Sequence, residues 1–181
     1  VLTSYIIAMA ITTPLCGWLA ERFGRRNVLL VSIAGFTVVS GLCGISTNLE
    51  ELVLFRFLQG MFGSSLIPLS QVILMTLNPP EERGKSMAIF GLGFIMGPLI
   101  GPLLGGWLTE NYSWHWVFLI NLPVGVLAFF GTLTYLPNNE DVHRPFDLFG
   151  FGLLALAIGA LQLVFDRGGS NDWFHSTEIC V

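Results

Sequence analysis

The chain has little charge. Only 11% of its 181 residues are Asp, Glu, Lys or Arg, whereas a soluble domain carries about 25%. This deficit excludes a soluble core with a fully wetted surface. The eight basic residues form no patch of the kind that binds nucleic acid. Cysteine is also scarce, and Cys16, Cys43 and Cys180 form no disulfide framework, so we expect reduced, unpaired thiols.

What the chain has in place of charge is a series of long apolar runs. They cover residues 1–20, 28–47, 52–77, 87–108, 116–136 and 146–165. A helix rises about 1.5 Å per residue, so about 20 residues cross a hydrocarbon core of about 30 Å. Because unpaired backbone groups cannot be left in lipid, each run is predicted to be a transmembrane helix. The predicted fold class is therefore all-α, a polytopic transmembrane helix bundle.

Lys and Arg are distributed unevenly between the loops. Six of the eight lie in the first, third and fifth loops, whereas the opposite loops hold only Arg167. The positive-inside rule places the richer loops in the cytoplasm and the other loops, 46–51, 109–115 and 166–176, outside. The chain lacks an initiating Met and begins within an apolar run, so we expect an internal piece of a longer membrane protein.

The loop between the first two runs combines glycine with charge. Its candidate gating residues are Gly17, Glu21, Arg22, Gly24, Arg25 and Arg26. Glycine permits close backbone approach and a tight turn. If this stretch is helical, Glu21 and Arg25 are spaced to pair, and such charges can latch neighbouring helices in one conformation and release them in another. The alternative is that the arginines only set the topology.

Arg56 is the only basic residue inside an apolar run, about 6 Å along a helix from its start. Intramembrane charges are costly and usually face a bundle interior or a cavity. Gln59, Gly60 and Gly63 follow on the same helix face, and we predict that they face a cavity. The alternative is that Arg56 snorkels to the outer headgroups.

The run 87–108 carries regularly spaced glycines, namely Gly93, Gly97, Gly101 and Gly105. A spacing of four places them on one helix face, which can approach another helix closely. Pro98 and Pro102 remove backbone donors and are expected to bend the helix. Close packing and a bend together favour a gating helix, and static packing is the alternative.

The sequence gives no sign of a metal or catalytic site. His115, His143 and His175 are scattered among loops without metal-ligand spacing. The spans contain no Ser-His-acid grouping and no paired carboxylates, which an intramembrane enzyme would need. We therefore predict no bound metal and no enzymatic activity.

Together these motifs resemble the major facilitator superfamily, in particular its fourteen-helix drug:proton antiporters of the EmrB/QacA type. The first loop is similar to the signature G-x-L-a-D-r-x-G-r-k, with Glu21 in place of the usual Asp. The stretch from Arg56 to Gly60 is similar to the R-x-x-x-G signature of helix four, whose arginine is implicated in proton coupling. The segment from Trp114 to Gly125 resembles W-R-W-x-F-x-x-N-x-P-x-G, with His115 in place of Arg.

The antiporter signature of helix five, G-x8-G-x3-G-P-x2-G-G, is also present apart from Pro102, which replaces the final glycine. The matching residues are Gly84, Gly93, Gly97, Pro98 and Gly101. This signature is typical of exporters and not of uptake systems. It therefore implies the direction of transport.

The resemblance implies that residues 1–136 form most of an N-terminal six-helix bundle without its first helix. Residues 137–181 are then a cytoplasmic linker, the first of two extra linking helices and the following outer loop. The implied function is export of hydrophobic or amphipathic drugs by alternating access in the cell (inner) membrane. The energy source is the proton gradient, with no cofactor, and the implied proton carrier is a carboxylate on helix one, outside this chain.

The implied partners are small amphipathic substrates and the lipid bilayer. In a double-membraned bacterium, a periplasmic adaptor and an outer-membrane channel are further expected partners, with the loop 166–173 as a candidate contact. Two alternatives are an exporter of a specific metabolite or siderophore and a non-transport membrane scaffold or sensor with the same fold. A scaffold should tolerate changes at Arg56 and in the glycine-proline helix.

Overall fold

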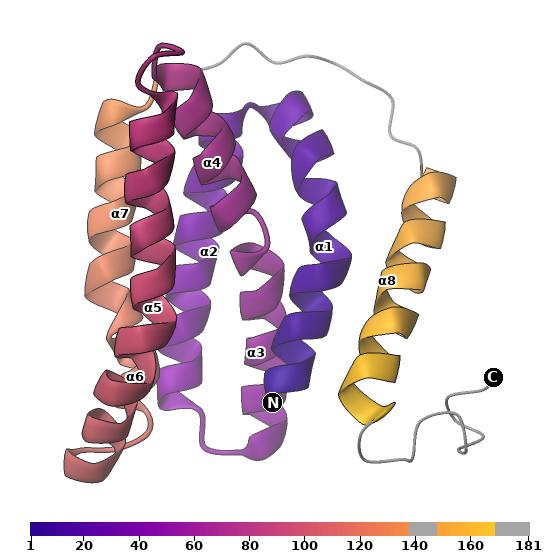
Figure 1. The fold of residues 1–181 in the computed structure, drawn as a ribbon. Helices are drawn as coiled ribbons and strands as arrows, with labels where there is room; N and C mark the ends of the chain where they lie inside the picture. The colour runs from indigo at the N-terminus through magenta and orange to yellow at the C-terminus, as the bar shows by residue number, and fades with distance from the viewer. Residues whose placement is uncertain (138–147, 169–181) are drawn as a thin grey trace.

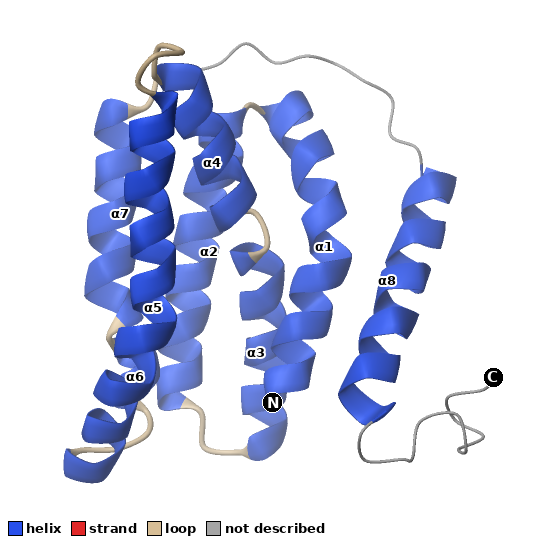
Figure 2. Ribbon diagram, viewed as in Figure 1, coloured by secondary structure: helices blue, strands red, loops and turns tan. Residues whose placement is uncertain are grey.

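The computed structural model describes residues 1–137 and 148–168, and these residues form α-helices and no β-strand (Figure 2). The helices are α1 (Leu2–Phe23), α2 (Arg25–Ile45), α3 (Leu49–Gly63), α4 (Leu66–Leu77), α5 (Arg83–Asn111), α6 (Trp116–Leu119), α7 (Asn121–Tyr135) and α8 (Leu148–Gly168). Five stretches are long and apolar enough to cross a membrane, namely Leu2–Phe23, Arg25–Ile45, Leu49–Leu77, Arg83–Asn111 and Trp116–Tyr135. They coincide with the first five predicted runs, which confirms the prediction of an all-α, multi-span bundle.

The sixth predicted run, 146–165, corresponds to α8. Its apolar stretch, Phe149–Gln162, is shorter than the five full spans, although α8 itself continues to Gly168. This helix packs against α1 at the edge of the bundle (Figure 1). The predicted linker and outer loop fall mostly on residues 138–147 and 169–181, which lie outside the described residues.

Helix α2 lies at the centre of the bundle and packs against α1, α3, α4, α6 and α7. Helix α3 packs against both α1 and α2, whereas α5 packs mainly against α4 and α6. The α1–α2 junction and the α4–α5 turn lie at one end of the bundle, and the α2–α3 loop lies at the other (Figure 1). The two most basic loops of the described chain therefore share one end, which we call the cytoplasmic end.

The apolar core consists of two clusters on the α2 axis. The cluster toward the cytoplasmic end is formed by Ala20, Leu29, Ile33, Leu69 and Ile73. The cluster toward the other end is formed by Val39, Cys43 and Phe118, with Leu52, Phe55, Leu58 and Phe62 packed against it. Without a hydrophobic drive between helices in lipid, such interlocking side chains hold the helices together by van der Waals contact.

Two predicted spans are broken where we expected continuous helices. The run 52–77 is interrupted at Ser64 and Ser65, and the run 116–136 at Ile120. In both cases the next helix has proline as its third residue, Pro68 in α4 and Pro123 in α7. Proline lacks a backbone donor and clashes with the carbonyl four residues earlier, but it is tolerated in a first turn. Each proline therefore favours a new helix start over a continuous span.

Gly60 allows α3 to lie directly against α1. A Cβ atom at Gly60 would overlap the backbone carbonyl oxygen of Tyr5 and would lie 3.0 Å from Cβ of Ala8. A backbone atom cannot rotate away as a side chain can, so only glycine fits at this crossing. This close approach brings Tyr5 of α1 onto the same side of α3 as Arg56.

We expect Gly60→Ala to lower the melting temperature of the detergent-solubilised protein. The added methyl group must push α1 and α3 apart, and overpacking of this kind costs about 1–3 kcal/mol. The matched control is Gly41→Ala in α2, where the new Cβ would meet only the Leu122 side chain, at an ordinary 3.6 Å. Equal melting temperatures for the two variants would contradict the close α1–α3 contact.

Candidate functional site

Arg56 is half-buried on α3, and its guanidinium group lies among side chains of other helices. Its carbon Cζ is 4.4 Å from the centroid of the Phe118 ring in α6 and 5.7 Å from that of Tyr5 in α1. Its Nη1 donates a hydrogen bond to Oε1 of Gln59 at 3.2 Å. These contacts direct Arg56 toward neighbouring helices, and cation–π attraction to two rings offsets part of the cost of a charge in the membrane.

Gln59 connects Arg56 to two further helices. Its side chain is 1% exposed and donates through Nε2 to Oγ of Ser40 in α2. The same oxygen accepts a hydrogen bond from Nδ2 of Asn121 in α7 at 3.1 Å. The polar network of Arg56, Gln59, Ser40 and Asn121 therefore links α3, α2 and α7. Buried polar groups need such partners, because water cannot replace them in the bundle.

One donor atom of this network has no acceptor. Within the described residues, the Nε of Arg56 is buried and has no hydrogen-bond partner. A buried donor left without an acceptor carries a desolvation cost of about 1–3 kcal/mol. The described part of the chain therefore supplies the setting for Arg56 but not every partner of its charge.

The predicted cavity-facing residues are placed differently from expectation. Gln59, Gly60 and Gly63 do lie on one face with Arg56, but all three are buried against other helices. Gln59 belongs to the polar network, Gly60 packs on Tyr5, and Gly63 lies close to Tyr5 and Phe36. This stripe therefore packs against neighbouring helices, and its two glycines let the helix backbones approach closely.

The cytoplasmic junction turns at Gly24, whose φ of 81° is the left-handed conformation that glycine adopts without strain. This residue ends α1 and precedes α2, so Glu21 and Arg25 lie on separate helices and not one helical turn apart. Gly17 is exposed, and a Cβ there would meet nothing within 4 Å. Arg22 is also exposed, with its Cζ 5.1 Å from the Trp18 ring.

The other two arginines of the junction contact the ends of other helices. Arg25 donates from Nη1 to Oγ1 of Thr76, in the last turn of α4, at 3.1 Å. Arg26 donates from Nη2 to the carbonyl oxygen of Leu133, in the last turn of α7, at 2.6 Å. Helix C-termini carry unpaired carbonyls and partial negative charge, which arginine complements. The two arginines thus fasten the α1–α2 junction to α4 and α7.

The glycine face of α5 is uncovered in the described structure. A Cβ at any of its motif glycines would meet no described atom within 4 Å, as found for Gly84, Gly93, Gly97, Gly101 and Gly105. The helix runs without interruption through Pro98 and Pro102, and none of its residues is buried. The predicted close packing of this face therefore requires a helix other than those described here.

Sequence reasoning missed the partners that complete the site. The sequence analysis did not single out Ser40, and it placed Asn121 only in the Trp114–Gly125 signature, because periodicity does not show which spans lie side by side. His115 was also missed as a structural residue. Its Nε2 lies 3.2 Å from the carbonyl oxygen of Ser46 and its Nδ1 2.8 Å from Oγ of Ser113, which ties the segment before α6 to the end of α2.

Comparisons with known proteins identify the family of this chain. Residues 1–168 match the Major Facilitator Superfamily. The chain belongs to this superfamily. It is 44% identical to the multidrug export protein EmrB of Haemophilus influenzae over its full length, but it spans only 36% of that relative. It is 43% identical to the fatty acid resistance protein FarB of Neisseria gonorrhoeae, covering 99% of this chain and 36% of FarB.

Solved structures support the same fold. The inward-open xylose transporter XylE of E. coli superposes with a TM-score of 0.66 at 20% identity, covering 92% of this chain and 45% of XylE. The human organic anion transporter MFSD10 gives a TM-score of 0.66 at 24% identity, covering 90% of this chain and 37% of that protein. The prediction of a multi-pass membrane protein of the major facilitator type is confirmed, and the chain spans about a third of its curated relatives.

Ser40→Ala should destabilise the bundle, because it removes the oxygen that accepts from both Gln59 and Asn121. Leaving a buried amide donor unsatisfied costs about 1–3 kcal/mol, which should appear as a lower melting temperature in detergent. Ser86→Ala, in the first turn of α5, is the control and should change stability by less than about 0.5 kcal/mol. Equal melting temperatures for the two variants would show that the network does not contribute to stability.

Proposed function

We propose that the protein to which this chain belongs exports hydrophobic or amphipathic compounds by alternating access, coupled to inward flow of protons. The observation that carries the proposal is Arg56, a basic residue that the bundle keeps in its interior with a dedicated polar network. Intramembrane charge is costly and is usually retained for function. The names of the relatives support the substrate class, since EmrB is a multidrug export protein and FarB a fatty acid resistance protein.

In this mechanism Arg56 interacts with a carboxylate from a part of the protein outside this chain. The opposite charge favours the ionised carboxylate, so a proton binds there only when the pair is disturbed. Gln59 holds Nη1 of Arg56 in place, and the Nε of Arg56 has no partner among the described residues. Proton binding then weakens the attraction and couples the proton to a rearrangement of the two bundles.

The cytoplasmic junction acts as the latch of the alternating cycle. Arg25 and Arg26 attach the junction to α4 and α7, so it moves with this bundle as one body. Glu21 and Arg22 are exposed and form the part of the latch that contacts the second bundle in one conformation and releases it in the other. The uncovered glycine face of α5 receives a closely packed helix from the rest of the protein.

The proposed role is transport and not catalysis, with the proton gradient as its energy source and no cofactor. We assign residues 1–136 to one bundle without its first helix, and residues 137–181 to the linker, an extra helix and an outer loop. In a cell with two membranes, a periplasmic adaptor and an outer-membrane channel are the proposed partners. Export of one specific metabolite or siderophore is the alternative for the cargo.

Dye transport by the intact protein tests the proposal. In energised inside-out vesicles, a fluorescent cationic dye should accumulate and the signal should collapse when a protonophore is added. Arg56→Ala should abolish accumulation, since removal of a group needed in the coupling step costs at least about 10²-fold in rate. Arg83→Ala, an exposed arginine at the start of α5, should transport normally.

Two outcomes would contradict this mechanism. Dye accumulation that survives the protonophore would exclude proton coupling. Proton-driven transport that survives Arg56→Ala would remove Arg56 from the coupling path, provided that immunoblots show equal amounts of both proteins in the membrane. Failure of the dye alone, with transport of a metabolite or siderophore, would favour the specific exporter.

A further inference from the structure

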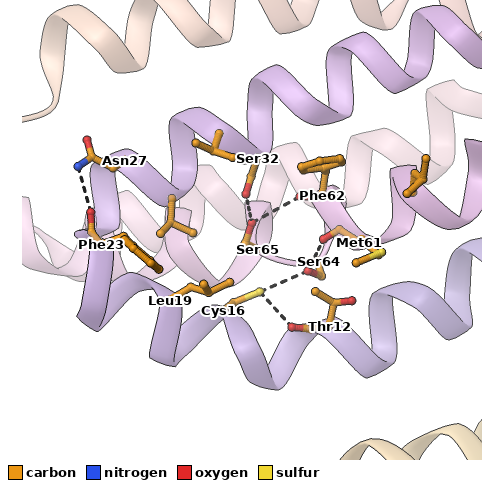
Figure 3. A pocket seen from close by; sticks show the side chains of 13 residues that line it. Thr12, Cys16, Leu19, Phe23, Asn27, Ser32, Met61, Phe62, Ser64 and Ser65 are labelled. Carbon is orange, nitrogen blue, oxygen red and sulfur yellow. Dashed lines mark hydrogen bonds between the residues drawn. The ribbon is translucent and has the colours of Figure 1, made fainter. Parts of the chain in front are cut away.

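A cavity of about 590 Å³ lies between α1, α2 and the junction of α3 with α4 (Figure 3). This volume falls in the range of small-molecule sites, about 300–1,000 Å³. The residues of the polar network around Arg56 do not line it. Its lining residues are Thr12, Cys16, Leu19, Phe23, Asn27, Val28, Val31, Ser32, Leu58, Met61, Phe62, Ser64 and Ser65.

The cavity is created by the break in the third span. Helix α3 packs closely on α1, but beyond Ser65 the chain continues as α4, which packs against α2 and α5. The break is fixed on both sides, because Ser65 donates to Oγ of Ser32 in α2 and Oγ of Ser64 lies 3.3 Å from Sγ of Cys16 in α1. These bonds therefore maintain the space between α1 and α2 on their cytoplasmic side.

The end of the cavity that lies deeper in the membrane contains polar residues that hydrogen-bond to one another or to the backbone. The Ser64 hydroxyl donates to the Met61 carbonyl oxygen at 2.7 Å, so the single S–H of Cys16 is shared between Oγ of Ser64 and the Thr12 carbonyl oxygen, which lies 3.4 Å away. Figure 3 shows these side chains bonded to one another and to backbone oxygens. Paired hydroxyls leave little for a polar ligand to bind, so this end suits an apolar chain.

The length of the cavity matches one leaflet of a bilayer. Thr12 and Phe23, at its two ends on α1, are 11 residues apart in the sequence. That spacing corresponds to about 16 Å along a helix, close to half of a hydrocarbon core of about 30 Å. Phe23 and Met61 are 49% and 39% exposed, so the cavity is open along its rim.

A positive charge lies beside the cytoplasmic end of the cavity. The Cζ of Arg22 lies 5.5 Å from the ring centroid of Phe23, which lines the cavity, and Asn27 lies at the same end with its Nδ2 bonded to the Phe23 carbonyl oxygen. Arg22 is the junction arginine beside the cavity, because Arg25 and Arg26 contact α4 and α7, and the lining contains no charged side chain. Such a site is complementary to an anionic headgroup and not to a cationic one.

We propose that this cavity binds a single-chain lipophilic anion, namely a long-chain fatty acid in the cytoplasmic leaflet. The acyl chain lies between α1 and α2 and reaches toward Cys16 and Ser64, and the carboxylate lies near Arg22 and Asn27. The proposal shares with the proposed function only the class of compound. It concerns binding, so it stands or fails independently of proton-driven export.

Photolabelling tests the site directly. The intact protein is reconstituted in phosphatidylethanolamine vesicles without a proton gradient and irradiated with a diazirine analogue of palmitic acid. Mass spectrometry should then locate adducts on residues 12–32 and 58–65, and excess unlabelled palmitate should remove them. Met61→Trp, which fills the cavity, should reduce this labelling by at least about fivefold, the effect of losing a buried apolar contact. Leu54→Trp, an exposed position on the same helix outside the cavity, should label as the parent does.

A second comparison tests the headgroup. Arg22→Gln should weaken palmitate competition by about twofold to fivefold, the range of one exposed charge pair. Competition by palmityl alcohol, which has no charge, should be unchanged. Both results together would support an anion at this end of the cavity.

Several results would overturn the proposal. Adducts spread evenly over α5 and α8, or labelling that Met61→Trp leaves intact, would show only general contact with lipid. Phosphatidylglycerol that competes as well as palmitate would identify a membrane phospholipid as the occupant. Absence of labelling in a protein that still exports dye would show that another segment of the protein fills the cavity, while the proposed export would stand.

Discussion

The structure depends on one constraint of the bilayer, namely that polar groups inside it must find their partners within the protein. Gln59 shows how the chain meets this constraint, because a single buried amide accepts from Arg56 and donates to Ser40. Ser40 in turn accepts from Asn121, so three helices are held in register by side chains that would be unfavourable alone. The same network of hydrogen bonds therefore holds the Arg56 side chain and joins the three helices.

Close packing supplies the remaining stability, and it depends on where side chains are missing. Gly60 brings α3 onto the backbone of α1, and Gly125 brings α7 onto the Thr37 side chain of α2. Lipid offers apolar side chains as good an environment as the protein interior, so burial alone does not join helices in a membrane. Short contacts at glycine and a few hydrogen bonds replace the hydrophobic drive of a soluble core.

The spans, their order and their orientation could be predicted from the sequence, because length, apolarity and the position of Lys and Arg are local properties. The position of Arg56 against other helices could also be predicted, since a charge in an apolar run usually faces the interior of a bundle. Its partners could not, because the contacts with Tyr5 and Phe118 come from distant spans whose neighbours are set by packing. The breaks before Pro68 and Pro123 were not predicted, although both prolines are in the sequence, because each apolar run is long enough to be a single helix.

The break between α3 and α4 gives the two halves of the third span different mechanical attachments. The outer half is bound to α1 and α2 and contains Arg56, whereas the inner half packs against α2 and α5. Arg25 donates to Thr76 in the last turn of α4 and so ties the inner half to the α1–α2 junction, whereas the Gln59 network ties the outer half to α2 and α7. The cytoplasmic junction and the buried charge are therefore anchored to different halves of one span.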